Sequence, residues 1–389
     1  MLAMAAVLQS KPKVVVWATA ASAVVGWPFA LVAALPYALY VLAAGRFVGA
    51  VVTGALTVGV AMGASAAADF FFYGRWTISQ LNIMRYNAGG GDSVLYGVEP
   101  WHFYLRNGAN NFNAMLPLAL AAPALIAAAH CLAPASFPGG GVRLRLVAAI
   151  LPLHVWLATV SSLPHKEERF LFVVYPHICL GAAAALAAAP ALVSALLRAA
   201  GFPRGFSRAA IRLGIACIVV LACALSVSRS AAIITNYGAP MKTFAALPAS
   251  NSTQTVCLAG EWHRFPSSFF LPGPLYRVGF VKSGFAGLMP LPFDNAIGGT
   301  MGAPAELNDR NQEVASQYVA GGEAACDFFV DLEIGGGPFR SGDTHWEVMA
   351  EEPFVDAPRS PPLYRALYIP GVSSKHVVYG RYVLLRRKE

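Results

Sequence analysis

Long apolar runs impose the strongest constraint on what this chain can fold into. Six runs without Asp, Glu, Lys or Arg cover residues 14–44, 47–68, 113–132, 146–163, 171–197 and 213–227. A helix needs roughly 20 apolar residues to cross a hydrocarbon core of about 30 Å. Only 12% of the 389 residues are charged, about half the share in an ordinary soluble domain. The sequence therefore predicts a polytopic α-helical membrane protein with about six spans.

The first of these runs leaves two foldings open. It contains Trp27-Pro28 and Pro36, and proline interrupts the hydrogen-bond ladder of a helix. Residues 1–45 therefore form either one kinked span or two shorter segments, and the sequence does not decide between them.

The charged residues divide the chain near residue 228. Residues 1–228 hold 14 Lys or Arg and five acids, whereas residues 229–389 hold 14 basic and 15 acidic residues. The net charge of +8 thus belongs to the apolar part and is no nucleic-acid signature. Short β-type runs at 256–258, 328–332 and 376–385, with Pro/Gly turns between them, predict a soluble α/β or mixed-β domain over residues 229–389.

Basic loops predict the orientation of the spans, because Lys and Arg concentrate in short cytoplasmic loops. The segment 198–212 contains four Arg and no acid, and an earlier loop carries Arg143 and Arg145. Both segments are expected to be cytoplasmic. Alternation then places loops 69–112 and 164–170, together with the domain 229–389, on the lumenal side.

Two of the six cysteines, Cys257 and Cys326, lie in the polar part of the chain. An oxidising lumen would allow them to form a disulfide, and two buried free thiols are the alternative. Asn251-Ser252-Thr253 is a glycosylation sequon that only a lumenal placement would make usable. Because no CxxC spacing occurs, we expect no zinc site.

The loop His165-Lys166-Glu167-Glu168-Arg169-Phe170 places five titratable side chains between two apolar runs. Charges at a membrane boundary cost free energy unless they are paired or used, so the cluster is a candidate site. Lys166 and Arg169 can hold a phosphate, either glutamate can orient them, and the histidine can donate or accept a proton. A turn whose charges only anchor the membrane interface is the alternative.

The segment 73–112 interleaves aromatic residues with amides, arginines and carboxylates, a composition suited to sugar binding. The glycine triplet 89–91 lacks the context of a phosphate-binding loop and is interpreted as a flexible segment. Some of the aromatic residues could instead form a belt at the membrane surface. The candidate sugar contacts are Tyr96, Glu99, Trp101 and Asn107.

The string from His165 to Phe172, followed by Tyr175-Pro176, resembles the signature loop of the dolichyl-phosphate-mannose-dependent mannosyltransferases. These enzymes form glycosyltransferase family 22 of the GT-C superfamily. Within the family, further strings resemble the α-1,2-mannosyltransferases of lipid-linked oligosaccharide assembly. Those strings lie at residues 26–29, 81–83, 95–113 and 261–269.

The resemblance implies a GT-C type fold in the endoplasmic reticulum membrane, multi-pass, with a lumenal C-terminal domain. It implies transfer of mannose, with inversion, from dolichyl phosphate mannose to a dolichyl-diphosphate-linked oligosaccharide in α-1,2 linkage for protein N-glycosylation. The expected partners are these two lipids and the bilayer, without nucleic acid. No cofactor is assigned, and a divalent cation requirement is left open. The expected donor phosphate-binding residues are His165, Lys166, Glu168 and Arg169.

The resemblance extends from about residue 26 to residue 385 and leaves out the first spans of the family. There relatives carry an acidic residue regarded as the catalytic base, and no residue here is matched to it. We therefore assign no catalytic residue and expect either a truncated chain or a degenerate homologue. A GPI-anchor mannosyltransferase of the same family and a non-catalytic remnant that binds lipid-linked glycan are the alternative functions.

Overall fold

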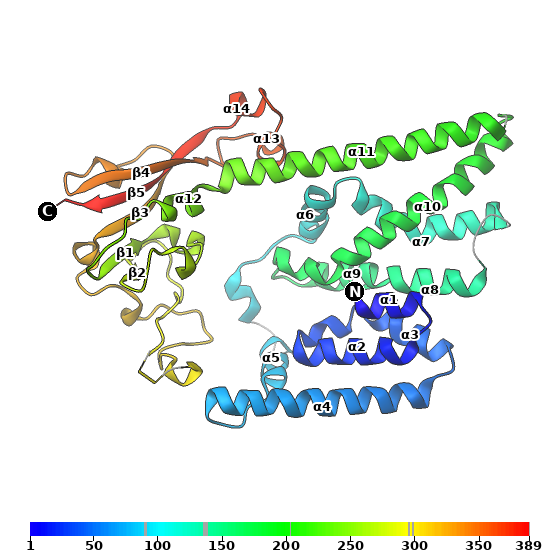
Figure 1. Cartoon of the computed structure of the whole chain (residues 1–389), viewed down its shortest axis with the longest axis horizontal. Coiled ribbons are helices and arrows are strands. Elements are labelled where there is room, and N and C mark those ends of the chain that lie inside the picture. Colours follow the sequence, from blue (N-terminus) through cyan, green and yellow to red (C-terminus); the bar gives the residue numbers. More distant parts are fainter. Residues whose placement is uncertain (89–91, 135–138, 203, 295, 298, 389) are drawn as a thin grey trace. The chain divides into compact units, whose positions relative to one another are not determined.

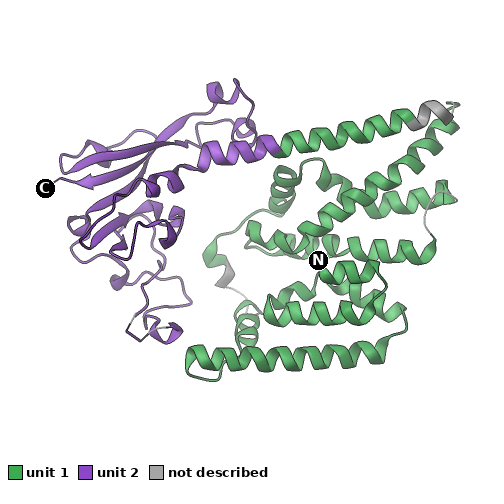
Figure 2. Ribbon diagram, in the orientation of Figure 1, with its two compact units in different colours: residues 1–226 green, residues 227–389 purple. Residues whose placement is uncertain are grey.

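The computed structural model describes the chain except for residues 89–91, 135–138, 203, 295, 298 and 389 (Figure 1). The chain forms two compact units, Met1–Ser226 and Val227–Glu389 (Figure 2). The division falls within helix α11 and lies two residues before the boundary predicted after residue 228. Each unit is described by itself below.

The first unit is helical, as its composition predicts. Its helices are α1 (Leu2–Leu8), α2 (Pro12–Val25), α3 (Leu35–Ala43), α4 (Phe47–Tyr73), α5 (Ser79–Ala88), α6 (Phe103–Phe112), α7 (Met115–Leu132), α8 (Gly140–Ile150), α9 (Pro152–Ser162), α10 (Tyr175–Ala199) and α11 (Arg204–Tyr237). Short 3-10 helices include η1 (Pro28–Leu31), η2 (Asp92–Tyr96) and η4 (Glu168–Val174).

Five helical segments among the described residues are long and apolar enough to cross a membrane. They are Phe47–Tyr73, Met115–Leu132, Gly140–Ser162, Glu168–Ala199 and Ala209–Tyr237. The other run, 14–44, is divided among α2, η1 and α3, which agrees with shorter segments, one of the two foldings left open for residues 1–45. Pro28 and Pro36 each sit in the first turn of a new helix, where a missing N–H costs nothing.

Helices α7 and α10 pack closely against each other along much of their length. Gly181 on α10 makes this approach possible, because a Cβ built there would lie 3.1 Å from the Cα of Ala119 on α7. Small residues at such contacts let two membrane helices gain van der Waals packing. Nearby, the indole Nε1 of Trp156 on α9 donates to the carbonyl of Phe170, at 2.7 Å, and fixes η4 against α9.

The second unit contains a five-stranded mixed sheet in the order β2-β1-β3-β5-β4. Strand β1 runs parallel to β2 and β3, whereas β5 runs antiparallel to β3 and β4. The strands are β1 (Gln254–Leu258), β2 (Tyr276–Phe280), β3 (Phe328–Glu333), β4 (Trp346–Val355) and β5 (Tyr379–Arg387), and the short helices are α12 (Ala239–Ala245), α13 (Pro362–Ala366) and α14 (Ser373–His376). The predicted mixed-β character is therefore confirmed.

Alternating side chains bury both faces of this sheet. Along β5, Tyr382 and Leu384 belong to one hydrophobic cluster, and Val383 and Leu385 belong to another. Successive residues of a strand point to opposite faces, so the two clusters lie on opposite sides. The predicted start of the last strand at His376 is wrong, because that residue ends α14 and β5 begins at Tyr379.

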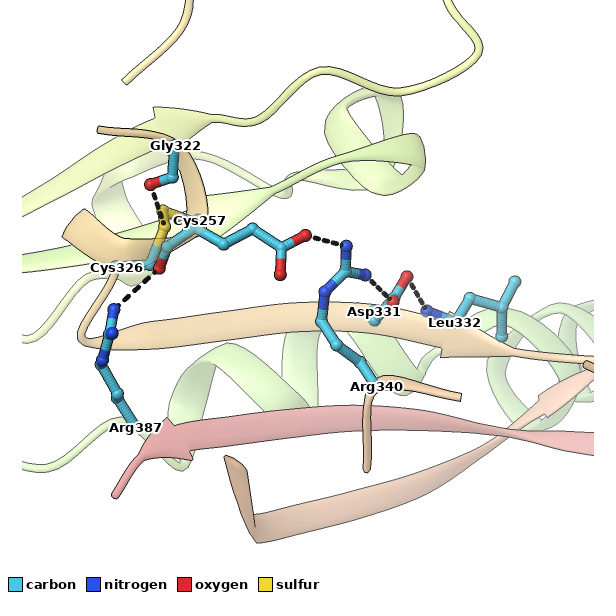
Figure 3. A network of polar contacts seen from close by, with 8 residues as sticks. Cys257, Gly322, Cys326, Asp331, Leu332, Arg340 and Arg387 are labelled. Carbon is cyan, nitrogen blue, oxygen red and sulfur yellow. Dashed lines mark hydrogen bonds and ion pairs between the residues drawn. A yellow bond between two sulfur atoms is a disulfide. The ribbon is translucent and has the colours of Figure 1, made fainter. Parts of the chain in front are cut away.

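A disulfide joins Cys257 on β1 to Cys326, which lies just before β3, with the two Cα atoms 5.8 Å apart. Both residues are buried in the core. In Figure 3 the ion pair between Arg340 and Asp331 lies near this disulfide, and Arg340 also pairs with Glu323. The segment around Cys326 is thus held by polar contacts as well as by the covalent bond.

Outside this core, Asn251 of the sequon is exposed, three residues before β1 begins. Its side chain is therefore open to modification from the surface of the second unit.

Candidate functional site

The loop 164–170 is fastened to the segment 97–100 by main-chain and side-chain hydrogen bonds. The N–H of Glu99 donates to the carbonyl of Pro164, at 3.1 Å. The ammonium of Lys166 donates to the carbonyl of Glu99, at 2.8 Å, and also to that of Leu163. Lys166 is only 6% exposed, so its charge faces carbonyl oxygens inside the protein. The ammonium of Lys166 therefore links the loop 164–170 to the segment 97–100.

Glu167 forms the centre of a polar cluster on the same loop. Its carboxylate holds Arg169 in a bidentate contact, with Nε at 2.6 Å and a terminal nitrogen at 2.8 Å. The same carboxylate lies 3.1 Å from Nε2 of His165, whose Nδ1 lies 3.0 Å from the carbonyl of Gly97. Bidentate arginine–carboxylate contacts fix the plane of the guanidinium. Arg169 and His165 are thus oriented by one carboxylate.

A cavity of about 420 Å³ opens beside this cluster. Tyr86 and Tyr96 line it with their hydroxyl oxygens 3.2 Å apart, and the ring of Trp27 lies 5.3 Å from that of Phe170. The side chain of Arg169 is 68% exposed, and three of its five N–H donors are not used by Glu167. The lining residues are Trp27, Ile83, Tyr86, Asn87, Tyr96, His165, Glu167, Arg169 and Phe170.

The cavity combines aromatic walls with one exposed guanidinium, a chemistry suited to a ligand that carries both a sugar and an anionic group. Aromatic faces pack against apolar surfaces, and arginine recognises phosphate oxygens in pairs. Among the described residues, no group of three His, Cys, Asp or Glu is placed to hold a metal ion. The question of a divalent cation stays open.

Tyr104 on α6 lies behind the polar cluster and is only 1% exposed. Burial raises the pKa of its phenol to about 12, and the negative charge of Glu167 acts in the same direction. The phenol is therefore neutral at physiological pH.

The structure brings together three of the eight residues predicted for donor or sugar binding, namely Tyr96, His165 and Arg169. The other five do not line the cavity. Lys166 is committed to backbone carbonyls, and Glu99 contributes its own backbone to the same contacts. Glu168 is not a lining residue, and its carboxylate accepts a hydrogen bond from Asn111 at 2.5 Å.

The two remaining residues lie on and before α6. Trp101 is 68% exposed, with its ring 5.6 Å from that of His102, and Asn107 is half-buried within the helix. Their roles in sugar binding stay predictions. The glycine triplet 89–91 lies outside the described residues.

Sequence reasoning assigned no role to Trp27, Ile83, Tyr86 or Asn87, which line the cavity. The sequence spacing could have grouped three of them. Ile83, Tyr86 and Asn87 are three and four residues apart, so on helix α5 they share one face. Trp27 precedes the helix-breaking Pro28, and its position is set by packing against Trp156 and Phe170.

Comparison with known proteins identifies relatives of this chain. The model of the Alg9-like mannosyltransferase family matches residues 1–272. The Alpha-1,2-mannosyltransferase ALG9 of Arabidopsis thaliana is 37% identical over 94% of this chain and 62% of its own length. The proteins of the same name from Mus musculus and Homo sapiens are each 32% identical over 100% of this chain and 66% of their own length.

A second class of relative matches over a much shorter region. The GPI alpha-1,2-mannosyltransferase 3 of Danio rerio is 30% identical over 118 residues, or 30% of this chain. No solved structure matches the chain. The chain spans just under two thirds of the length of the curated relatives named above. The family match covers well over half of the chain, and the chain therefore belongs to the Alg9-like mannosyltransferase family.

Proposed function

We propose that this protein transfers mannose from dolichyl phosphate mannose to a dolichyl-diphosphate-linked oligosaccharide in α-1,2 linkage, as a step of protein N-glycosylation. The observation that carries the proposal is the exposed guanidinium of Arg169, oriented by Glu167 at the wall of an aromatic cavity. Relatives that match almost the whole chain are named α-1,2-mannosyltransferases. The match to a GPI mannosyltransferase covers too little of the chain to favour that alternative.

The chemistry of the cavity fits the donor lipid. During transfer, the bond between the anomeric carbon and the phosphate oxygen breaks while the acceptor hydroxyl oxygen bonds to that carbon. Negative charge then grows on the departing dolichyl phosphate, and the N–H groups of Arg169 that Glu167 does not use are available to stabilise it. The rings of Trp27, Tyr86 and Tyr96 offer faces against which a mannose can pack. The proton of the acceptor hydroxyl must pass to a base, which we do not assign.

We place the reaction in the endoplasmic reticulum membrane, with the second unit on the lumenal side. The disulfide between Cys257 and Cys326 supports this placement, because such bonds persist in oxidising compartments. The exposed sequon at Asn251 agrees with it. Occupancy of Asn251 by an N-glycan, measured as a mass shift removed by an endoglycosidase, tests the orientation.

The proposal is tested by expressing this chain in cells that lack the endogenous α-1,2 activity and by measuring their lipid-linked oligosaccharides. The wild type should extend the accumulated intermediate by mannose. Arg169→Ala should reduce this extension by roughly 100-fold, the usual cost of losing one charge-stabilising donor. Arg386→Ala, which removes an exposed ion pair with Glu347 in the second unit, should leave it unchanged.

Two results would contradict the proposal. Extension that is independent of Arg169 would refute the phosphate assignment. A wild-type chain that binds dolichyl phosphate mannose without extending any intermediate would instead favour the non-catalytic alternative. Addition of mannose to GPI precursors, without effect on dolichol-linked ones, would favour the GPI function.

A further inference from the structure

The geometry around His165 limits what this histidine can do. Its Nδ1 lies 3.0 Å from the carbonyl oxygen of Gly97, and its Nε2 lies 3.1 Å from the carboxylate of Glu167. Both ring nitrogens therefore point at oxygen atoms of the protein. Both oxygens accept hydrogen bonds, so a neutral ring donates to one of them and a protonated ring donates to both. In each form the two nitrogens face these oxygens and not a ligand in the cavity. His165 is poorly placed to accept a proton from an acceptor hydroxyl.

The ring of His165 is also enclosed by its neighbours. Its side chain is only 14% exposed, and the rings of Tyr96 and Phe170 lie 5.9 and 6.1 Å from it. Turning the imidazole toward the cavity would break both of its polar contacts. The histidine thus acts as a rigid link between the segment around Gly97 and the loop around Glu167.

Glu167 links this rigid histidine to Arg169. One of its oxygens is shared between His165 and Arg169, and the other contacts Nε of Arg169 at 2.6 Å. Arginine has several rotatable bonds, and its side chain is 68% exposed, so without the carboxylate its guanidinium would sample many orientations. A series of contacts thus runs from the carbonyl of Gly97 through His165 and Glu167 to Arg169. These contacts fix the guanidinium of Arg169 relative to the backbone around Gly97.

We propose that Glu167 is a positioning residue that orients Arg169 toward the donor phosphate, and that His165 braces Glu167 and does not transfer a proton. This inference rests on the proposed function, because it assigns duties within the same transfer. The proposal gives different roles to the two neighbouring glutamates, Glu167 and Glu168. Glu167 acts on Arg169, whereas Glu168 bonds to Asn111 on α6 and leaves the cavity wall untouched.

The test is a double-mutant cycle on the full chain in microsomes, with dolichyl phosphate mannose as the varied substrate. Glu167→Gln should raise the KM for this donor or lower kcat by roughly 10- to 100-fold in total, the usual effect of misplacing a catalytic group. Glu167→Asp, which keeps the charge, should recover part of the loss. On the Arg169→Ala background, Glu167→Gln should cost less than threefold more, because Glu167 acts through Arg169.

Glu347→Gln is the matched control, since it removes a carboxylate that contacts Arg386 at 2.8 Å in the second unit. It should change neither kinetic constant. Full additivity of Glu167→Gln and Arg169→Ala would overturn the positioning role. Thermal unfolding of each variant identifies any that fails to fold, and in that case Glu167→Asp carries the cycle.

His165→Gln tests the second half of the inference. A glutamine amide can still donate to Glu167 but cannot act as a base, so kcat should stay within about tenfold of the wild type, and the shape of the pH profile should not change. A loss of 100-fold or more, the size expected for removing a general base, would overturn the bracing role. If the wild type itself transfers no mannose, the proposed function fails first, and the two failures are thus distinguishable.

Discussion

Removing the disulfide of the second unit should destabilise that unit by an amount set by the number of residues between the two cysteines. Cys257 and Cys326 are 69 residues apart in sequence. In the chain-entropy account, closing a loop of this length lowers the entropy of the unfolded chain enough to stabilise the fold by about 4 kcal/mol. For a unit of this size, each kcal/mol shifts the midpoint by roughly 2–4 °C, so we expect a fall of roughly 8–16 °C.

The perturbation is Cys257→Ala/Cys326→Ala, which suits the apolar surroundings of both residues. Alanine also removes two sulfur atoms from the core, and that packing loss adds to the entropic effect. Treating the wild type with a reductant separates the two contributions, because reduction breaks the bond and leaves both sulfur atoms in place. Ion pairs of Arg340 with Asp331 and Glu323 should keep the reduced unit folded at low temperature.

The assay is scanning fluorimetry of the detergent-solubilised chain at one heating rate, with and without reductant. Cys217→Ala/Cys223→Ala is the matched control, because both residues are free thiols in the first unit, and it should unfold as the wild type does. Alkylation of the denatured, unreduced chain should label the four free cysteines Cys131, Cys179, Cys217 and Cys223. Labelling of all six, or a midpoint that does not respond to reductant, would refute the reasoning.

Two further predictions concern the first unit. Gly181→Val should lower the midpoint of thermal unfolding, because its Cβ would press on Ala119, and we expect overpacking to cost about 1–3 kcal/mol. Gly214→Val is the control and should cost less in the same assay, since a Cβ there meets nothing within 4 Å. The raised pKa of Tyr104, about 12, means that its neutral phenol stabilises the fold fully below pH 10, the ordinary value, and that this contribution is lost as the pH rises toward 12. In ultraviolet difference spectra, Tyr104→Phe should remove one tyrosine that ionises near pH 12, and an unchanged titration curve would contradict the assignment.

The apolar runs predicted most of the helical unit, because the length needed to cross a bilayer is fixed and is readable as composition. Residues 14–44 are the place where composition left two foldings open. There Pro28 and Pro36 each begin a new helix, and composition alone does not tell a kinked helix from separate short ones. In the second unit, strand β4 was missed because it contains three glutamates and a proline, which resemble loop composition.

The charged loop shows why a site can be predicted without its internal contacts. Glu167 and Glu168 are equivalent in the sequence, yet Glu167 has extended backbone angles and Glu168 begins η4, so their side chains diverge. Lys166 meets the carbonyl of Glu99, 67 residues earlier in the chain. Only the tertiary fold determines these partners. From residue type alone, Lys166 was predicted to bind phosphate, whereas in the structure its buried ammonium donates to backbone carbonyls of two loops.

Strand β4, which ends the sheet on one side, also bears on how this unit behaves at high protein concentration. An outermost strand exposes unpaired N–H and C=O groups that could add a strand from another molecule. In β4 the pairing register shifts between Val348 and Ala350. Its three glutamates, Glu347, Glu351 and Glu352, form ion pairs with Arg386, Arg381 and Lys242. A second copy approaching this side would meet an irregular backbone and charged side chains that already have partners. The register shift and the paired charges therefore disfavour strand addition between folded copies at high protein concentration.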